Sequence, residues 1–274
     1  MKKLSHSIIV VCGLIILLSG CRPEKIELGP ALDKTALKFT VSPSANNPND
    51  IVLKSLTPNA TPYWVSPSGN SIRITDTVNI PFPGTYTIKY AVQSRGGLVY
   101  ADPVTITINS IDQNTVSQPM WVALTGGLGK SKTWVLDLDA AAKSKYFDGP
   151  FYFGGTGWEW APKFSDIPWA GVSAGDYGTM TFDLMGNANF SSDNKMFPDL
   201  SGTGTFMLYT NTNELQTIGA QVLHDKAQGG QVANWNAKML IKTLTDSTMQ
   251  LIAKKDANNW LIYNYTTKHY YDTH

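Results

Sequence analysis

The sequence predicts an all-β protein made of two successive domains. Residues 36–110 and 117–274 contain many short segments in which apolar and polar residues alternate, such as GTYTIKYAV over 84–92. This period of two is typical of half-buried strands. Clusters of Ser, Asn, Pro and Gly separate the segments, as turns do. The polar stretch NSIDQNTVSQP (109–119) reads as a linker, and 274 residues are enough for two ordinary domains.

The beginning of the chain has the pattern of an export signal. Two lysines precede an apolar run over 8–18 that is too short to span a bilayer comfortably, and the run ends in the tetrapeptide LSGC. These four residues resemble the lipobox of bacterial lipoproteins, in which cleavage before the cysteine frees it for acylation. The resemblance implies a signal peptide over 1–20 and a membrane anchor on Cys21. We expect the protein at the outer membrane, facing the exterior, with a periplasmic position as the alternative. Residues 21–35 are expected to form a tether.

Composition narrows the classes of partner. The formal net charge is +1 and only 16% of residues are charged, without a basic stripe, so nucleic acid is not an expected partner. The only cysteines are Cys12 and Cys21, which leaves the domains without a thiol nucleophile, a disulfide or a thiolate metal site. Abundant Asn, Thr, Ser, Gly and aromatic residues suit a neutral, hydroxyl-rich ligand.

The first domain, over 36–110, resembles PKD (polycystic kidney disease) domains. Their late strands carry a Phe-x-x-x-Gly-x-Tyr run, of which PFPGTY (81–86) is a compressed version. YWVSPSGNS (63–71) stands where those domains have a Trp-Asp-Phe-Gly-Asp-Gly signature, but the aspartates are missing. The resemblance implies a divergent PKD/Ig-like β-sandwich that acts as a spacer, with Trp64 in its core.

The second domain, over 117–274, contains seven of the eight tryptophans. Short turns separate its last three candidate strands, which indicates an antiparallel meander. Eight or so strands with little helix predict a jelly-roll-like antiparallel β-sandwich. Trp121 and Trp134 lie in apolar segments and are expected in its core. LDAAAKSKYF and GAQVLHDKA are the only segments with helical character. The candidate strands are MWVALT, KTWVLDLD, PFYFGG, YGTMTFDLM, GTFMLYT, AKMLIKTL, STMQLIA and NWLIYNY.

Catalytic constellations are weak in this domain. Glycoside hydrolysis needs two carboxyl groups at a fixed separation, and the only glutamates are Glu159 and Glu214. A catalytic Glu159 partnered by an aspartate is the enzymatic alternative. A Ser-His-Asp triad would need His224 or His269, and no Gly-x-Ser-x-Gly elbow supports it. TGGLGKS (125–131) lacks the first glycine of a phosphate loop and precedes a strand pattern. We therefore expect no catalytic residues.

Metal and cofactor sites are not expected either. The histidines outside the export signal show no spacing typical of a zinc site; they are His224, His269 and His274. A structural calcium ion stays open as an alternative, because carboxylates and amides suffice for it. Its candidate ligands are Asp137, Asp139 and Asp193. Asp137 and Asp139 can equally cap a strand end and a turn.

The segment TGWEWAPKFSDIPW (156–169) is the best candidate for a binding site. Sugars lay C–H faces on aromatic rings and need polar partners for their hydroxyls, which tryptophan and asparagine supply. If 157–161 is extended, Trp158 and Trp160 point one way and Glu159 the other, either toward a ligand or over the core. The segment ANWNAK adds a second aromatic residue with amide neighbours. The candidate ligand-binding residues are Trp158, Glu159, Trp160, Trp169, Trp235 and Asn236.

The second domain is similar to one that recurs in Bacteroidetes surface lipoproteins. There a Lys-Thr-Trp-Val strand, a Trp-rich loop and a Tyr-x-x-x-Thr-Phe strand follow in order, as they do here at 132–135, at Trp158 and Trp160, and at 177–182. The resemblance covers most of residues 117–265. It implies a non-catalytic accessory protein of a polysaccharide-utilisation system, which binds a neutral polysaccharide or oligosaccharide beside other outer-membrane glycan-uptake proteins. A structural or adhesive surface protein is the remaining alternative.

Overall fold

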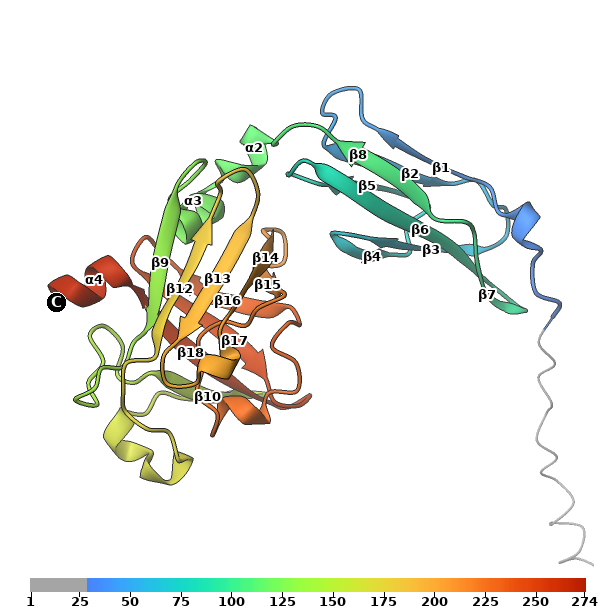
Figure 1. Cartoon of the computed structure of the whole chain (residues 1–274). Coiled ribbons are helices and arrows are strands. Elements are labelled where there is room, and N and C mark those ends of the chain that lie inside the picture. The colour runs from blue at the N-terminus through green and yellow to red at the C-terminus, as the bar shows by residue number, and fades with distance from the viewer. Residues whose placement is uncertain (1–28) are drawn as a thin grey trace, which may run out of the picture.

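The computed structural model describes residues 29–274 and shows two β-rich units joined end to end with a bend between them (Figure 1). The predicted signal peptide (1–20), Cys21 and most of the tether lie outside the described residues. Strands make up 43% of the described residues and helices 13%, and the strand pairings are antiparallel, which confirms the all-β prediction. Within 29–274, no helix combines the length and the apolar character needed to cross a bilayer.

The first unit consists of two sheets that share one hydrophobic core. β1, β2 and β5 form one sheet, and β4, β3, β6 and β7 form the other, in which β8 also pairs with β6. Alternation along β6 places Ile88, Tyr90 and Val92 inside and Thr87 and Lys89 outside, as predicted. The elements are η1 (Lys34–Ala36), β1 (Phe39–Pro43), β2 (Asp50–Ser55), β3 (Thr61–Ser66), β4 (Gly69–Ser71), β5 (Thr75–Asn79), β6 (Gly84–Ser94), β7 (Gly97–Tyr100) and β8 (Val104–Ile108).

Aromatic residues fill the centre of the first unit. Trp64 is fully buried, as predicted, and its ring centroid lies 4.4 Å from that of Tyr90. Phe39 from the opposite sheet stacks on Tyr90 at 4.5 Å, so the rings join the two sheets. The indole nitrogen of Trp64 donates to the carbonyl oxygen of Arg73 at 3.0 Å, which satisfies its only polar atom.

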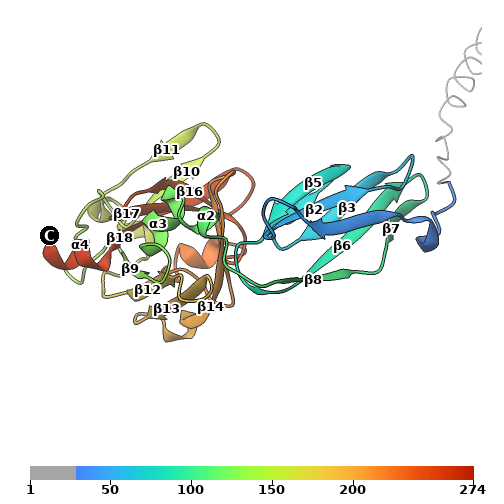
Figure 2. The ribbon, with the colours of Figure 1, turned by 90° about the horizontal axis from the view of Figure 1, so that it is seen from above.

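The second unit contains a sheet that closes on itself. Eight strands form the cycle β9-β12-β13-β14-β15-β16-β17-β18, and β18 pairs back with β9; β10 and β11 extend the sheet from β18. Figure 2 shows β10 and β11 at the rim of this barrel. The strands are β9 (Ser131–Leu136), β10 (Phe151–Gly155), β11 (Trp158–Trp160), β12 (Gly178–Asp183), β13 (Asn189–Asn194), β14 (Gly202–Tyr209), β15 (Glu214–Ile218), β16 (Met239–Leu244), β17 (Thr248–Lys254) and β18 (Asn259–Thr267).

This topology differs from the predicted jelly roll. From β12 to β18 every strand pairs with its neighbour in sequence, which extends the meander predicted for the last three strands to seven. The sheet closes because β18 is long: its first residues pair with β10, whereas Tyr265, Thr266 and Thr267 pair with β9. Strand alternation and turn spacing are alike in the two topologies, so they could not distinguish a closed sheet from two stacked sheets.

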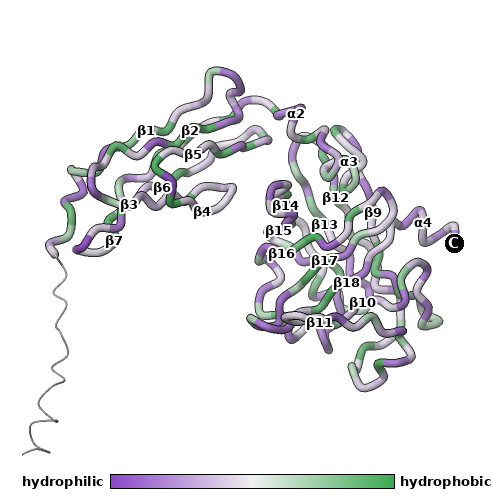
Figure 3. The backbone as a smooth tube through the Cα atoms, turned by 180° about the vertical axis from the view of Figure 1, so that it is seen from behind, coloured by the Kyte–Doolittle hydropathy of each residue, from purple (hydrophilic) through white to green (hydrophobic). Residues whose placement is uncertain are grey.

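The helices also differ from the prediction. MWVALT forms helix α3 (Pro119–Thr125) instead of a strand, because Pro119 occupies its first turn and Gly126 ends it with a φ of 84°. Trp121 is nevertheless buried, as predicted. LDAAAKSKYF and GAQVLHDKA form irregular loops. The remaining helices are α2 (Gln113–Val116), α4 (Lys268–Thr273), η2 (Phe164–Asp166), η3 (Pro168–Ala170), η4 (Pro198–Leu200) and η5 (Gly229–Gln231). Figure 3 shows hydrophobic residues along β16 and hydrophilic ones in α4.

Side chains fill the interior of the barrel. Trp134, Phe182 and Tyr263 are fully buried and belong to one hydrophobic cluster that includes inward-facing residues of the barrel strands. Eight strands enclose a space just wide enough for side chains. The loop between β15 and β16 adds Leu223 and Trp235 to the same cluster. A ligand must therefore bind outside the packed interior.

A polar junction fixes one unit against the other. Asp112 caps helix α2 and accepts hydrogen bonds from Asn47 (2.9 Å) and Asn79 (2.8 Å) of the first unit. Burial, the largest single influence, raises the pKa of Asp112, but the hydrogen bonds from Asn47, Asn79 and Thr115 together lower it below its ordinary value. Beside this junction Phe82 of the first unit packs against Trp121, with ring centroids 5.6 Å apart.

Replacement of Asp112 should loosen this junction. The lowered pKa means that ionised Asp112 stabilises the fold above its unfolded pKa, and that this contribution disappears as the pH falls through the folded value. We expect Asp112→Ala to lower the free energy of unfolding by about 1–3 kcal/mol at pH 7, with the difference shrinking below pH ~4. Denaturant titrations at several pH values measure it. Asp102→Ala, at an exposed aspartate paired with Lys34, is the control; an equal loss there would refute the assignment.

Candidate ligand-binding surface

The hairpin β10–β11 positions two of the predicted tryptophans. Trp158 pairs with Gly155 and Trp160 with Phe153, so the three aromatic side chains lie on one face of the hairpin and Glu159 on the other. This is the orientation that the sequence predicts for Trp158, Glu159 and Trp160. The turn is tight because Gly157 adopts a φ of 79°, a conformation that glycine accepts without strain.

The three tryptophans of residues 156–169 are exposed. The exposed fractions are 49% for Trp158, 43% for Trp160 and 62% for Trp169, whereas four of the other five tryptophans are buried. Burial of these three side chains would yield a substantial hydrophobic gain. A cluster of large apolar side chains that stays on the surface indicates a binding site more often than packing.

Two of the exposed rings share an orientation. The planes of Trp160 and Trp169 are within 11° of parallel and their centroids are 6.4 Å apart. Phe153, which is buried, lies 5.6 Å from Trp160 and 5.3 Å from Trp169 and so connects both rings to the core. We call Trp158, Trp160 and Trp169, with Phe153 beneath them, the aromatic surface.

Buried neighbours hold Trp169 in place. Trp169 belongs to the short helix η3 (Pro168–Ala170), and the residues on either side of Pro168–Trp169, Ile167 and Ala170, are both buried. The side-chain amide of Gln228 donates to the carbonyl oxygen of Ala170 at 3.0 Å. Since both ends of this turn are anchored, the exposed indole keeps its place beside Trp160.

The indole N–H groups of the aromatic surface have no hydrogen-bond partner in the described part of the chain. Those of the buried Trp64, Trp134 and Trp235 each donate to a backbone carbonyl oxygen at 3.0 Å. For Trp158, Trp160 and Trp169 no intramolecular acceptor is found within residues 29–274. Each exposed ring therefore offers an apolar face and a hydrogen-bond donor.

Gly155 makes room for Trp158. A Cβ atom at Gly155 would overlap the indole of Trp158, so that ring lies directly over the glycine backbone. On its other side Gly155 pairs with Asn259 of β18. The exposed Asn259 side chain therefore lies on the same face of the sheet as Trp158. Asn259 and the neighbouring Asp256, which it contacts at 3.0 Å, supply polar groups beside the rings.

Glu159 is separated from the aromatic surface. It lies on the opposite face of β11 and forms an ion pair with Lys242 on β16. The pair links the hairpin to the barrel strand that it crosses. A sugar stacked on Trp158 or Trp160 would therefore not meet this carboxylate.

The structure removes Trp235 and Asn236 from the candidate site. Trp235 is buried and its ring stacks on His224 with a centroid distance of 4.0 Å and an interplanar angle of 5°. The amide of Asn236 donates to the carbonyl oxygens of Thr217 (2.9 Å) and Ala220 (3.0 Å). Both residues hold the loop between β15 and β16 in place, because that loop packs on the barrel core and needs its own polar groups satisfied.

Most of the titratable residues considered for catalysis or metal binding have structural partners. Asp137 accepts backbone N–H groups of Lys145, Tyr146 and Phe147 at 2.7–3.1 Å, and Asp139 accepts those of two residues in the same loop. Burial raises the pKa of Asp137 despite these bonds, and burial lowers the pKa of His224. In the described part of the chain, no three His, Cys, Asp or Glu side chains are grouped to hold a metal, so Asp193 joins no such group.

Phe153 is the member of the aromatic surface that the sequence reasoning missed. The sequence contained a pattern that predicts it: FYFGG and WEW flank the dipeptide Thr156-Gly157, as the strands of a two-residue hairpin do. Such a hairpin places Phe153 directly across from Trp160. Comparison with known proteins found no family model and no curated sequence that matches this chain. The function has to be inferred from the geometry of the site.

Stability measurements can separate surface tryptophans from core tryptophans. We expect Trp169→Ala to change the free energy of unfolding by less than about 1 kcal/mol, since its side chain is mostly exposed. Trp134→Ala, inside the barrel, should cost about 3–5 kcal/mol. Urea titration monitored by circular dichroism measures both. Losses of similar size would mean that Trp169 belongs to the core.

Proposed function

We propose that this protein is a lipid-anchored surface protein whose aromatic surface binds a neutral polysaccharide or oligosaccharide without catalysis. The observation that carries the proposal is the cluster of three exposed tryptophans, two of them nearly parallel, with unengaged N–H donors. The export signal, acylation of Cys21 and a position on the outer membrane are parts of the same proposal. So is cooperation with other glycan-uptake proteins there.

The chemistry of the surface suits a sugar chain. Pyranose rings present faces of C–H groups, which pack on indole rings, while Asn259 and the indole N–H groups can bond to hydroxyls. The rings are held by Phe153, Ile167 and Ala170 before any ligand arrives, so little conformational entropy is lost on binding. No ionic partner is required, in agreement with the low content of charged residues.

The first unit is proposed to be a PKD/Ig-like sandwich that acts as a spacer. Its sheets have the order β1-β2-β5 and β4-β3-β6-β7, which corresponds to that of immunoglobulin-type strands. Tyr86, near the start of β6, donates its hydroxyl to the carbonyl oxygen of Phe82 at 3.0 Å, as in the tyrosine corner of such domains. Trp64 on β3 takes the place of the core tryptophan.

Affinity electrophoresis tests the proposed function. Neutral plant and host polysaccharides in the gel should retard the protein, and Trp160→Ala or Trp169→Ala should each weaken binding at least about tenfold, because each removes a stacking face and a donor. Tyr100→Ala removes an exposed aromatic residue of the first unit and is the matched control. Its mobility should equal that of the wild-type protein.

Three outcomes would contradict the proposal. Shortened polysaccharide chains that persist in Trp160→Ala but vanish in Glu159→Gln would identify a glycoside hydrolase. The absence of retardation on every polysaccharide would favour a structural or adhesive protein. Retardation that survives the double substitution of Trp160 and Trp169 would place the binding site elsewhere on the molecule.

A further inference from the structure

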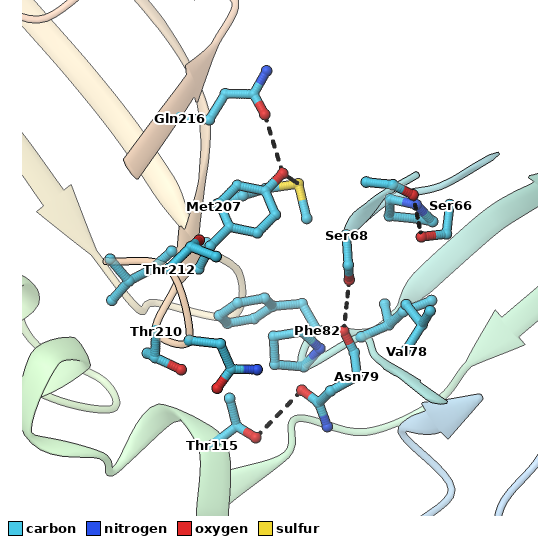
Figure 4. A pocket seen from close by; sticks show the side chains of 18 of the residues that line it. Ser66, Ser68, Val78, Asn79, Phe82, Thr115, Met207, Thr210, Thr212 and Gln216 are labelled. Atoms are coloured by element: carbon cyan, nitrogen blue, oxygen red, sulfur yellow. Dashed lines mark hydrogen bonds between the residues drawn. The ribbon is translucent and has the colours of Figure 1, made fainter. Parts of the chain in front are cut away.

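A large cleft separates the two units next to their junction. It has a volume of about 1120 Å³, which is ample for a ligand several rings long. One wall is the β3–β4 turn and the end of β5, and the other is the β14–β15 hairpin of the barrel. Figure 4 shows Ser68 and Asn79 on the first wall, Thr210 and Gln216 on the second, and Phe82 between them.

Buried aromatic residues line the base of this cleft. The ring of Trp121 lies 5.6 Å from those of Phe82 and Phe206, and all three residues line the cleft. Trp121 is only 2% exposed, yet its indole nitrogen has no hydrogen-bond partner within the described residues. An unsatisfied buried donor is rare and costs about 1–3 kcal/mol.

Polar side chains without partners line the walls. Other lining groups are engaged within the protein: Ser68 donates to the carbonyl oxygen of Asn79, and Tyr209 donates to Gln216. A second set makes no side-chain hydrogen bond to any residue of 29–274, although each member has a hydroxyl or an amide. These residues are Thr77, Gln118, Thr205, Thr210 and Asn211.

The charges around the cleft are compensated. Arg73 and Asp76 form an ion pair at 3.4 Å. Lys238 lies 3.7 Å from Glu214 and 3.5 Å above the ring of Tyr209. The charged residues that line the cleft, Arg73, Asp76 and Lys238, are therefore all paired. A charged ligand would have to compete with these pairs, whereas a neutral ligand with many hydroxyls matches the unpaired hydroxyls and amides.

We propose that the cleft between the two units is a second binding site, which takes a neutral oligosaccharide. Its ligand class rests on the proposed function of the aromatic surface, but its place does not. The sugar chain lies along the walls, with hydroxyls bonded to Gln118, Thr210 and Asn211, and passes over the base that contains Trp121. Because Asp112 and Phe82 fix the units together, the cleft exists before the ligand binds.

The eight tryptophan indole N–H groups allow both sites to be observed in one experiment. Each gives its own signal in a ¹H–¹⁵N correlation spectrum. The sample is the protein over residues 29–274, without the proposed lipid anchor. Maltohexaose, cellohexaose, xylohexaose and mannohexaose are added to it in turn. Ligand in the cleft should shift the Trp121 signal, and ligand on the aromatic surface should shift those of Trp158, Trp160 and Trp169. The Trp64 signal, from the core of the first unit, is the internal control.

The outcomes keep the two proposals apart. A saturable shift of Trp121 that persists in the double variant Trp160→Ala, Trp169→Ala supports the cleft site. Shifts confined to the aromatic surface overturn the cleft and leave the proposed function standing. A shift of Trp121 alone supports the cleft and overturns the aromatic surface. No shift with any of the four hexasaccharides overturns both.

Substitutions on the walls test the residues themselves. The double variant Gln118→Ala, Asn211→Ala should weaken the ligand affinity measured at Trp121 about tenfold, because two hydrogen bonds are lost. The affinity measured at Trp169 should not change. Asn114→Ala removes an exposed amide of α2 that does not line the cleft and serves as the control. Equal affinity at Trp121 in the double variant and in the control would overturn the assignment of the walls.

Discussion

The pairing of β18 with β9 is the constraint on which the second unit depends. Tyr265, Thr266 and Thr267 bond to Leu136, Val135 and Trp134, and this short ladder turns an open meander into a closed sheet. Closure leaves no free edge along the barrel and forces inward side chains into a narrow space, which aromatic residues fill. The two ends of β18 pair with different strands on this side: the last residues pair with β9 and the first with β10. The hairpin that carries Trp158 and Trp160 therefore extends the sheet from the part of β18 that β9 does not cover.

Because side chains fill the barrel, both proposed binding sites lie at its rims. The β10–β11 hairpin and the turn around Trp169 lie at one such place, where Phe153 joins exposed rings to the core. The β14–β15 hairpin lies at another, where it faces the first unit across the cleft. Both places combine a rigid apolar base with polar groups that the protein itself does not use. This is the arrangement that ligand sites need, because the site is ordered before the ligand arrives.

The junction between the units determines how the two units are held together. Phe82 leaves the core of its own unit and joins that of the barrel, while Asp112 ties the linker to Asn47 and Asn79. The segment predicted as a polar linker is thus tied to the first unit by hydrogen bonds. The first unit also shapes the cleft, since its β3–β4 turn forms one wall.

The sequence by itself determined the strand-rich character of both units, the alternation along β6, the burial of Trp64, Trp121 and Trp134, and the opposed orientation of Trp158 and Glu159. These features follow from local periodicity, which depends only on residues that are close in the sequence. Only the tertiary structure decided that the sheet closes, that MWVALT packs as a helix, and that Trp235 is buried while Trp169 is exposed. Those outcomes depend on partners distant in the chain, such as His224 stacking on Trp235, and a single sequence does not show which distant residues meet.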